Sequence, residues 1–339
     1  MFPFDAPAGS EIYLTLLIVT FALHQVLVGF VLTGTAYVLG RALRGGDDAL
    51  AAACRDWLPF VLGAAITAGV APLLMVQVLY QPRFYTANLL LFHRWMAIVP
   101  TLIVGFYLLY LGKSERARGW SRAARVAIAA VTWLCFVFVA WSWVENHALA
   151  MRRDPAAWVA QYRASSLRYD DVAIAPRLLL WLGVAGASWS AGVLGLAPSA
   201  TPADRRRSAV IALGGLVAAG VGALLVERAM DPSAVIFDLA PAQPWLVVAA
   251  VGALITAAAW GAVVVGRAPP AWIARVATAL LVLGLAAVRE ASRVAALDPS
   301  LRARLGDRQG FPLFVVMFVL GAAAIAWCLT ITRRHLRSR

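Results

Sequence analysis

Cysteine and charge are both scarce in this chain. The three cysteines, Cys54, Cys135 and Cys328, are widely separated. No CxxC pair or CxxCH motif is present, so the sequence lacks the usual cysteine ligands of zinc and iron–sulfur clusters and the attachment site of covalent haem. Charged residues make up 14% of the chain, whereas a soluble protein has about 25%. This shortage argues against a soluble protein.

Apolar residues take the place of the missing charge. They make up 62% of the 339 residues, and the mean hydropathy is +0.78. Apolar runs long enough to cross a hydrocarbon core recur along the whole chain. We predict an all-α fold, a polytopic membrane helix bundle with nine transmembrane helices, near residues 12–40, 57–80, 95–112, 126–146, 177–197, 208–228, 244–266, 272–290 and 311–332.

These spans are expected to form a single integral membrane domain. Its predicted parts are a first four-helix bundle (1–150), an outer loop (151–176), a second four-helix bundle (177–292), and a ninth helix with a basic tail (311–339). In the outer loop, Asp154 and Pro155 predict the start of a short helix. Trp158, Val159 and Tyr162 would share one face of this helix, so we expect it to lie along the membrane surface.

Lysine and arginine are concentrated on one side of the predicted bundle. That side holds 17 of them in 58 residues, in the segments 41–56, 112–125, 198–209, 267–275 and 333–339, and the opposite side holds 13 in 98. Because cytoplasmic loops carry the denser positive charge, we predict an outside N-terminus and a cytoplasmic C-terminus. The net charge of +13 is then a topological signal, and the expected surroundings are the lipids of a bacterial inner membrane, without nucleic acid.

One histidine lies deep in the first span, within the stretch FALHQVLVGFVLTGT. His24 is about 12 residues inside this span, roughly 18 Å from its outer start. Histidine is a common metal ligand and a usual axial ligand of haem, so His24 is a candidate ligand of a b-type haem, with Met75 and Met96 as weaker candidates for the sixth position. A histidine bonded to a nearby hydroxyl or carbonyl group is the competing interpretation, and a proton relay is a third.

Polar residues also gather where five predicted spans meet the outer side. Each residue alone suits an ordinary helix end, but together they bring acids, amides and imidazoles to one depth. A quinone headgroup needs a hydrogen-bond donor, an acceptor and a proton-accepting carboxylate. We therefore predict a quinone or docking site, with haem propionates or plain interfacial residues as alternatives, formed by Gln77, Gln81, His93, Arg94, Glu145, His147, Arg289, Glu290 and Arg293.

Three stretches resemble subunit I of the cytochrome bd-type quinol oxidases, and more closely the bd-like membrane proteins that accompany multihaem c-type cytochromes. They are FALHQVLVGFVLTGT, FVLGAAITAGVAPLLMVQVLYQPRFYTAN and WSWVENHALAMRRDP. The resemblance covers residues 10–200 and is only topological beyond them. It implies nine spans with an outside N-terminus, and it places His24 on the position of a haem-ligating histidine.

The chain also departs from that family. Leu180 stands where the resemblance would place a second haem-ligating histidine, and the third span, HRWMAIVPTLIVGFYLLYLG, lacks the family's carboxylates. The segment 227–243 is too short for the family's quinol-binding loop. These differences argue against a complete oxygen-reducing oxidase.

The function expected from residues and resemblance together is that of a membrane electron-transfer subunit. It would exchange electrons between membrane quinone and an extracytoplasmic partner, such as a multihaem c-type cytochrome, with one haem b at His24 if haem is bound. If it is part of an enzyme, that enzyme is a quinol/quinone oxidoreductase complex. A haem-free structural anchor is the alternative, and no cofactor at all is equally compatible with the sequence. A small-molecule transporter ranks last, since its midplane would need paired polar residues.

Overall fold

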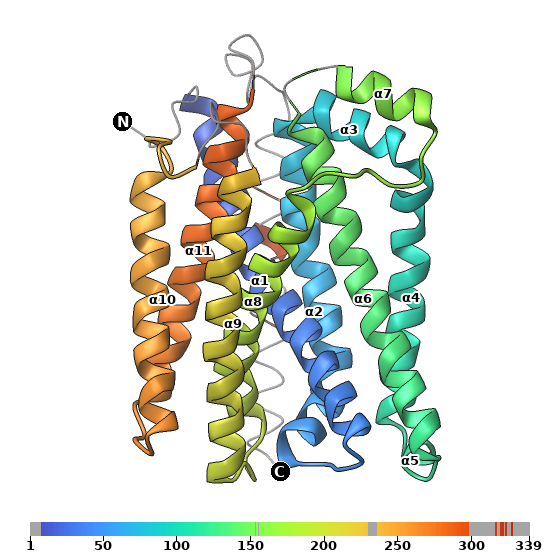
Figure 1. Ribbon diagram of the computed structural model, residues 1–339, viewed down its shortest axis with the longest axis vertical. Coiled ribbons are helices and arrows are strands. Elements are labelled where there is room, and N and C mark those ends of the chain that lie inside the picture. The colour runs from blue at the N-terminus through green and yellow to red at the C-terminus, as the bar shows by residue number, and fades with distance from the viewer. Residues whose placement is uncertain are drawn as a thin grey trace. The chain divides into compact units, whose positions relative to one another are not determined.

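The computed structural model describes residues 8–152, 154, 156–229 and 236–297, together with a few helical residues between 316 and 327. Between residues 8 and 297, the described residues form eleven helices (Figure 1): α1 (Ala8–Leu43), α2 (Ala49–Leu79), α3 (Gln81–Leu90), α4 (Phe92–Lys113), α5 (Glu115–Arg118), α6 (Arg122–Ala150), α7 (Ala156–Ala164), α8 (Ile174–Leu196), α9 (Pro202–Ala229), α10 (Gln243–Val264) and α11 (Ala271–Ala295).

Eight of the described helices are long and apolar enough to cross a membrane: α1, α2, α4, α6, α8, α9, α10 and α11. They coincide with the first eight predicted spans, and each reaches beyond its predicted span at one end or both. The prediction of a polytopic helical bundle is confirmed. The predicted ninth span belongs to a second compact unit, 306–339, and lies almost entirely outside the described residues.

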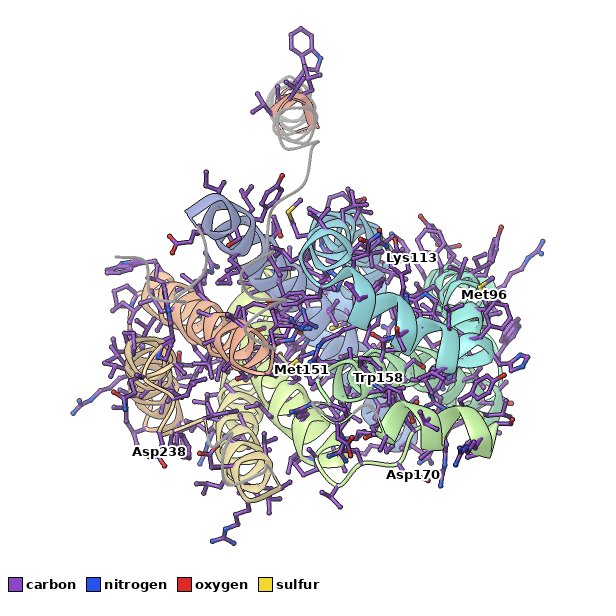
Figure 2. The ribbon with its side chains drawn as sticks, turned by 90° about the horizontal axis from the view of Figure 1, so that it is seen from above. Met96, Lys113, Met151, Trp158, Asp170 and Asp238 are labelled. Carbon is purple, nitrogen blue, oxygen red and sulfur yellow. The ribbon has the colours of Figure 1, made fainter. Side chains whose placement is uncertain are left out.

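The eight long helices run between two different ends of the bundle. At the basic end lie the α1–α2 connection, α5, and the α8–α9 and α10–α11 connections. The opposite end, the α3–α7 end, carries two short helices that lie across the bundle (Figures 1 and 2). Which end faces the cytoplasm stays a prediction.

Helix α3 was not predicted from the sequence, which suggested only a loop there. It begins directly after Tyr80, and Pro82 stands in its first turn. Proline has no N–H to donate and is tolerated in a first turn, so the chain can end α2 and start a new helix in another direction.

Helix α7 is present where the sequence predicts a short helix. The Ala156 N–H donates to Asp154 Oδ1 at 2.8 Å, as expected of a capping aspartate. Trp158 turns inward, and its Nε1 donates to the Leu149 carbonyl of α6 at 2.9 Å. Val159 and Tyr162 are exposed, so the three residues do not share one buried face.

Helix α1 is the centre of the bundle, because it packs against α2, α6, α8 and α11. Helices α2, α4 and α6 form one group, and α8, α9, α10 and α11 form the other (Figure 1). Gly29 brings α1 close to α8: a Cβ there would stand 3.0 Å from the Cα of Ala185. Helix α1 therefore packs against both groups.

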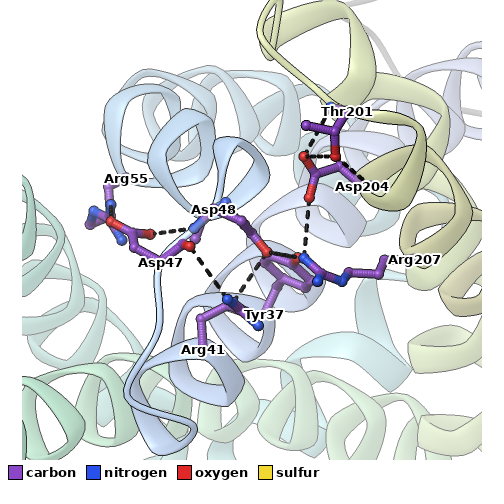
Figure 3. Close-up of polar contacts among 9 residues, drawn as sticks. Tyr37, Arg41, Asp47, Asp48, Arg55, Thr201, Asp204 and Arg207 are labelled. Atoms are coloured by element: carbon purple, nitrogen blue, oxygen red, sulfur yellow. Dashed lines mark hydrogen bonds and ion pairs between the residues drawn. The ribbon is translucent and has the colours of Figure 1, made fainter.

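At the basic end, the carboxylate of Asp48 joins three of these helices (Figure 3). It caps α2 by accepting from the Ala51 N–H at 2.9 Å. Its Oδ2 accepts from the Tyr37 hydroxyl at 2.6 Å and from Arg207 of α9 at 3.0 Å, and pairs with Arg41 at 3.1 Å. Because Tyr37 and Arg41 belong to α1, one side chain links α1, α2 and α9.

The contact between α8 and α9 depends on glycine. A Cβ on Gly222 would lie 2.4 Å from the backbone nitrogen of Leu180 and 2.9 Å from the carbonyl oxygen of Pro176. Atoms cannot approach this closely, so the helices would have to separate. Close packing through small residues is a main source of helix association in membranes.

We therefore expect Gly222→Ala to lower the free energy of unfolding by about 1–3 kcal/mol, the usual cost of overpacking. Thermal unfolding of the purified protein in detergent measures the change. Gly220→Ala is the matched control on the same helix, because a Cβ at Gly220 meets nothing within 4 Å. Equal stability of the two variants would contradict this account of the contact.

Candidate functional site

Five polar side chains meet near the α3–α7 end, and we call them the Glu290 cluster: Tyr80, His147, Arg289, Glu290 and Arg293. Tyr80 directly follows α2, His147 lies in the last turn of α6, and the other three lie near the end of α11. The carboxylate of Glu290 is fully buried, with 0% exposure. Three helices distant in the sequence thus contribute to one buried polar site.

Glu290 is the acceptor at the centre of the cluster. Its Oε2 accepts from the Tyr80 hydroxyl at 3.0 Å. Its Oε1 accepts from Arg289 and, at 3.3 Å, from Arg293. The Arg293 guanidinium also lies 4.9 Å from the centre of the Tyr80 ring, a cation–π distance. A buried carboxylate needs such partners to stay ionised.

The bond between Arg293 and His147 fixes the protonation of the imidazole. Arg293 Nη2 lies 2.7 Å from His147 Nδ1. Arginine can only donate, so Nδ1 must accept. A neutral His147 then carries its hydrogen on Nε2, and this N–H is a donor that the cluster does not use.

Positive charge exceeds negative charge in the cluster. Two guanidinium groups, of Arg289 and Arg293, face one carboxylate, and His147 is neutral in the arrangement just described. Arg177 of α8 adds a third cation that interacts electrostatically with Arg289, Arg293 and His147. Buried charge is costly without compensation, so this site favours a group that is anionic or becomes anionic during a reaction.

The loop after α7 borders the same region. Arg152 donates to the Tyr169 hydroxyl at 2.6 Å and pairs with Asp171 at 2.9 Å. Asp171 also interacts electrostatically with Arg177. Burial raises the pKa of the Tyr169 phenol above its ordinary value, so Tyr169 stays protonated and can donate at neutral pH.

The cluster reaches the deep histidine of α1 through Arg289. Its guanidinium lies 4.2 Å from the centre of the Phe21 ring. Phe21 is about one helical turn from His24 on α1, nearer the α3–α7 end. Arg289 and His24 also interact electrostatically. The predicted haem ligand and part of the predicted quinone site therefore lie close enough in the structure to interact electrostatically.

His24 itself binds the neighbouring helix α2. Its Nδ1 lies 2.9 Å from the carbonyl oxygen of Ala65, and since a carbonyl can only accept, Nδ1 carries the hydrogen. The ring rests against Gly69, where a Cβ would stand 2.7 Å from Cε1. Only glycine gives the imidazole this room.

The state of His24 fits one axial position of a haem. A ligating histidine commonly donates its second N–H to a carbonyl, which leaves the other nitrogen free for the metal, and Nε2 of a neutral His24 has that lone pair. The proposed sixth ligands fit poorly. Met75 is ten residues beyond Ala65 on α2, about 15 Å along the helix axis, and Met96 is 57% exposed at the edge of the bundle (Figure 2).

Glu145 and Arg94 form a second, separate cluster. Glu145 is buried, pairs with Arg94 Nε at 2.6 Å, and accepts from Trp141 Nε1 at 2.6 Å. Since residues two apart on a helix point in different directions, Glu145 faces α4 while His147 faces α11. The predicted single site is thus divided in the structure between two sides of α6.

The remaining predicted residues lie apart from both clusters. His93 is exposed and contacts only the ring of Phe92 among the ring contacts described, at 5.5 Å. Gln77 and Gln81 are half-buried near the junction of α2 and α3, and no hydrogen bond described for this part of the chain joins them to Glu290.

The roles of Tyr80, Phe21 and Arg177 do not follow from the sequence. A tyrosine at the end of a span has an ordinary interfacial explanation, and nothing in the pattern sets Tyr80 apart. Phe21 is one apolar residue among many in its span. Its closeness to Arg289 follows from the packing of α1 against α11, which spacing along the sequence does not reveal.

No three histidine, cysteine, aspartate or glutamate side chains within the described ranges are arranged to hold a metal ion. Comparison of the chain with protein-family models, with curated proteins and with solved structures finds no match.

We expect Glu290→Gln to destabilise the protein by about 3–5 kcal/mol, because it leaves two buried guanidinium groups without a counter-charge. Tyr80→Phe removes one hydrogen bond to the carboxylate and should cost less, about 1.5–3 kcal/mol. Thermal unfolding of both variants in detergent tests this order. Removing one of the facing charges with Arg289→Gln should partly restore Glu290→Gln. A Glu290→Gln protein as stable as the wild type would show that the cluster is unimportant for folding.

Proposed function

We propose that the chain is a membrane electron-transfer subunit. It exchanges electrons between membrane quinone and an extracytoplasmic redox partner, such as a multihaem c-type cytochrome. The α3–α7 end faces the outside, in accordance with the density of lysine and arginine at the other end. The Glu290 cluster takes the quinone headgroup.

The surplus of positive charge around Glu290 is the observation that carries this proposal. A quinone gains negative charge as it accepts electrons, and Arg289 and Arg293 would stabilise that charge. The unused N–H of His147 is available to donate to a headgroup oxygen. Conversion between quinone and quinol moves two electrons and two protons; the electrons pass to or from the partner, and Tyr80 and Glu290 offer a proton route beside the headgroup.

His24 adds a second feature that suits electron transfer. Its hydrogen-bonded Nδ1 and free Nε2 have the arrangement of a haem ligand. A b-type haem bound there would supply a one-electron carrier near Arg289. The role of the protein is to hold the imidazole in this tautomer, through Ala65, and to shape the space around it, through Gly69.

A surface at the α3–α7 end supports a protein partner on that side. The loop after α7 exposes Leu167 and Val172, and α7 exposes Tyr162 at 75%. Exposed apolar side chains beside polar ones are typical of docking surfaces.

A haem-free structural anchor is the second candidate. The observation that favours it is that protein donors already satisfy both oxygens of Glu290, as in a cluster that only holds helices together. The close packing of α8 and α9 suits this function equally well.

An optical spectrum distinguishes the two candidates. We expect wild-type protein from a cytochrome-competent host to show a reduced-minus-oxidised b-type band, and His24→Ala to abolish it, because the ligating nitrogen is lost. His93→Ala is the matched control, since His93 is exposed and away from the cluster. Wild-type protein without any such band would refute the haem part and favour the anchor.

Quinone binding can be tested separately from haem. Short-chain ubiquinone and menaquinone analogues, titrated into detergent-solubilised protein, should quench tryptophan fluorescence. His147→Gln still offers an acceptor to Arg293 but changes the unused donor, and we expect about tenfold weaker binding, the effect of losing one hydrogen bond. His93→Gln should bind like the wild type. If neither analogue binds, or if both variants bind equally well, the cluster is not a quinone site.

A further inference from the structure

A cavity lies at the basic end, far from the Glu290 cluster. It has a volume of about 110 Å³ and is formed by α1, α2, α4, α5 and α6 together with the α1–α2 connection. We call it the α1–α6 recess. It lies at one end of four of the membrane-length helices, α1, α2, α4 and α6, at the depth of lipid headgroups.

The interior of the α1–α6 recess is apolar. Leu58, Leu109 and Ile128 contribute aliphatic side chains to it. Two threonines also line it, but the hydroxyl of Thr35 donates to the Val31 carbonyl at 2.7 Å and that of Thr132 to the Ile128 carbonyl at 2.7 Å. With their hydroxyl groups bonded within their own helices, these threonines add no unsatisfied polar atom to the wall.

Arginine surrounds the mouth of the recess. Arg41, Arg55 and Arg125 all line it, whereas Asp47 is the one acidic residue in the lining. Arg55 pairs with Asp47, and Arg41 pairs with Asp48 just outside the recess (Figure 3). Arg125 is exposed, and none of the ion pairs described for this part of the chain includes it. The mouth therefore carries a positive charge that no acidic side chain within the described ranges neutralises in an ion pair.

We propose that the α1–α6 recess binds an anionic phospholipid. The phosphate would lie between Arg125 and Arg55, since guanidinium groups match phosphate oxygens in geometry and charge. The apolar interior would take the first carbons of one acyl chain. Free phosphate would leave that interior without a function, so the combination selects an amphiphile.

The size and surroundings of the recess agree with a lipid held at its headgroup. The cavity is too small for a whole lipid, so both chains must continue outside the protein. Helix α4 exposes Val104, Tyr107 and Leu111 to its surroundings, and these side chains offer a surface along which the chains can lie. Lipid binding at the recess does not depend on the binding of quinone or haem.

Native mass spectrometry of detergent-solubilised protein with equal amounts of phosphatidylglycerol and phosphatidylcholine tests the proposal. Wild-type protein should retain phosphatidylglycerol preferentially. One arginine near anionic lipid contributes about fivefold in affinity, so Arg125→Gln should weaken retention about fivefold, and Arg125→Gln with Arg55→Gln about 25-fold. Arg206→Gln is the matched control: Arg206 is exposed on α9 at the same end and does not line the recess.

The apolar interior is tested by filling it. Gly112 lines the recess, and a Cβ there meets nothing within 4 Å, so Gly112→Leu should fold and reduce lipid retention. Gly261→Leu is its control, because Gly261 also has open space but lies on α10. Equal retention of the two lipids by the wild type would overturn the proposal. So would retention by Arg125→Gln and Gly112→Leu that matches their controls, since lipid would then bind elsewhere.

Discussion

The carboxylate of Glu290 is the constraint on which one end of the bundle depends. It lies on the last long helix of the compact unit, yet its partners include Tyr80, after the second helix, and Arg293, which in turn binds His147 of α6. A buried carboxylate must be paired or it loses its charge, so these helices have to meet at one place. The same pairing leaves a net positive charge there. Structure and proposed function thus have one origin: the bonds that hold the helices together also create a site suited to a group that becomes anionic.

At the other end, Asp48 links α1, α2 and α9. Between the two ends most contacts are made by apolar and small residues, with Trp189 and Leu58 in the main core and glycines where α8 meets α9. The bond between His24 and the Ala65 carbonyl is an exception. In lipid, apolar surface alone gives little reason for helices to associate, and packing and polar contacts take over that task. The two polar clusters accordingly lie at the ends, where they fix the relative positions of helices whose other contacts are mostly apolar.

The sequence predicts the eight described spans well because hydrocarbon thickness sets the length of an apolar helix. It predicts candidate residues less well, because depth along a span does not specify the direction of a side chain. Glu145 and His147 have the same predicted depth but face different neighbours, and His93 at a similar depth faces outward. Tyr80 and Phe21 carry no unusual signal in the sequence. Helix α3 was not predicted because its ten residues are too few and too polar to indicate a membrane span.

The central position of α1 has a consequence for how this protein is made. This helix leaves the ribosome before the other described helices, yet its surface around Phe21 is completed by Arg289 of α11, about 270 residues later in the chain. Until α11 is made, that face contacts lipid or another helix. The bundle is therefore completed late in biogenesis. A chain released before α11 is made would expose the face of α1 around Phe21 to the surrounding helices.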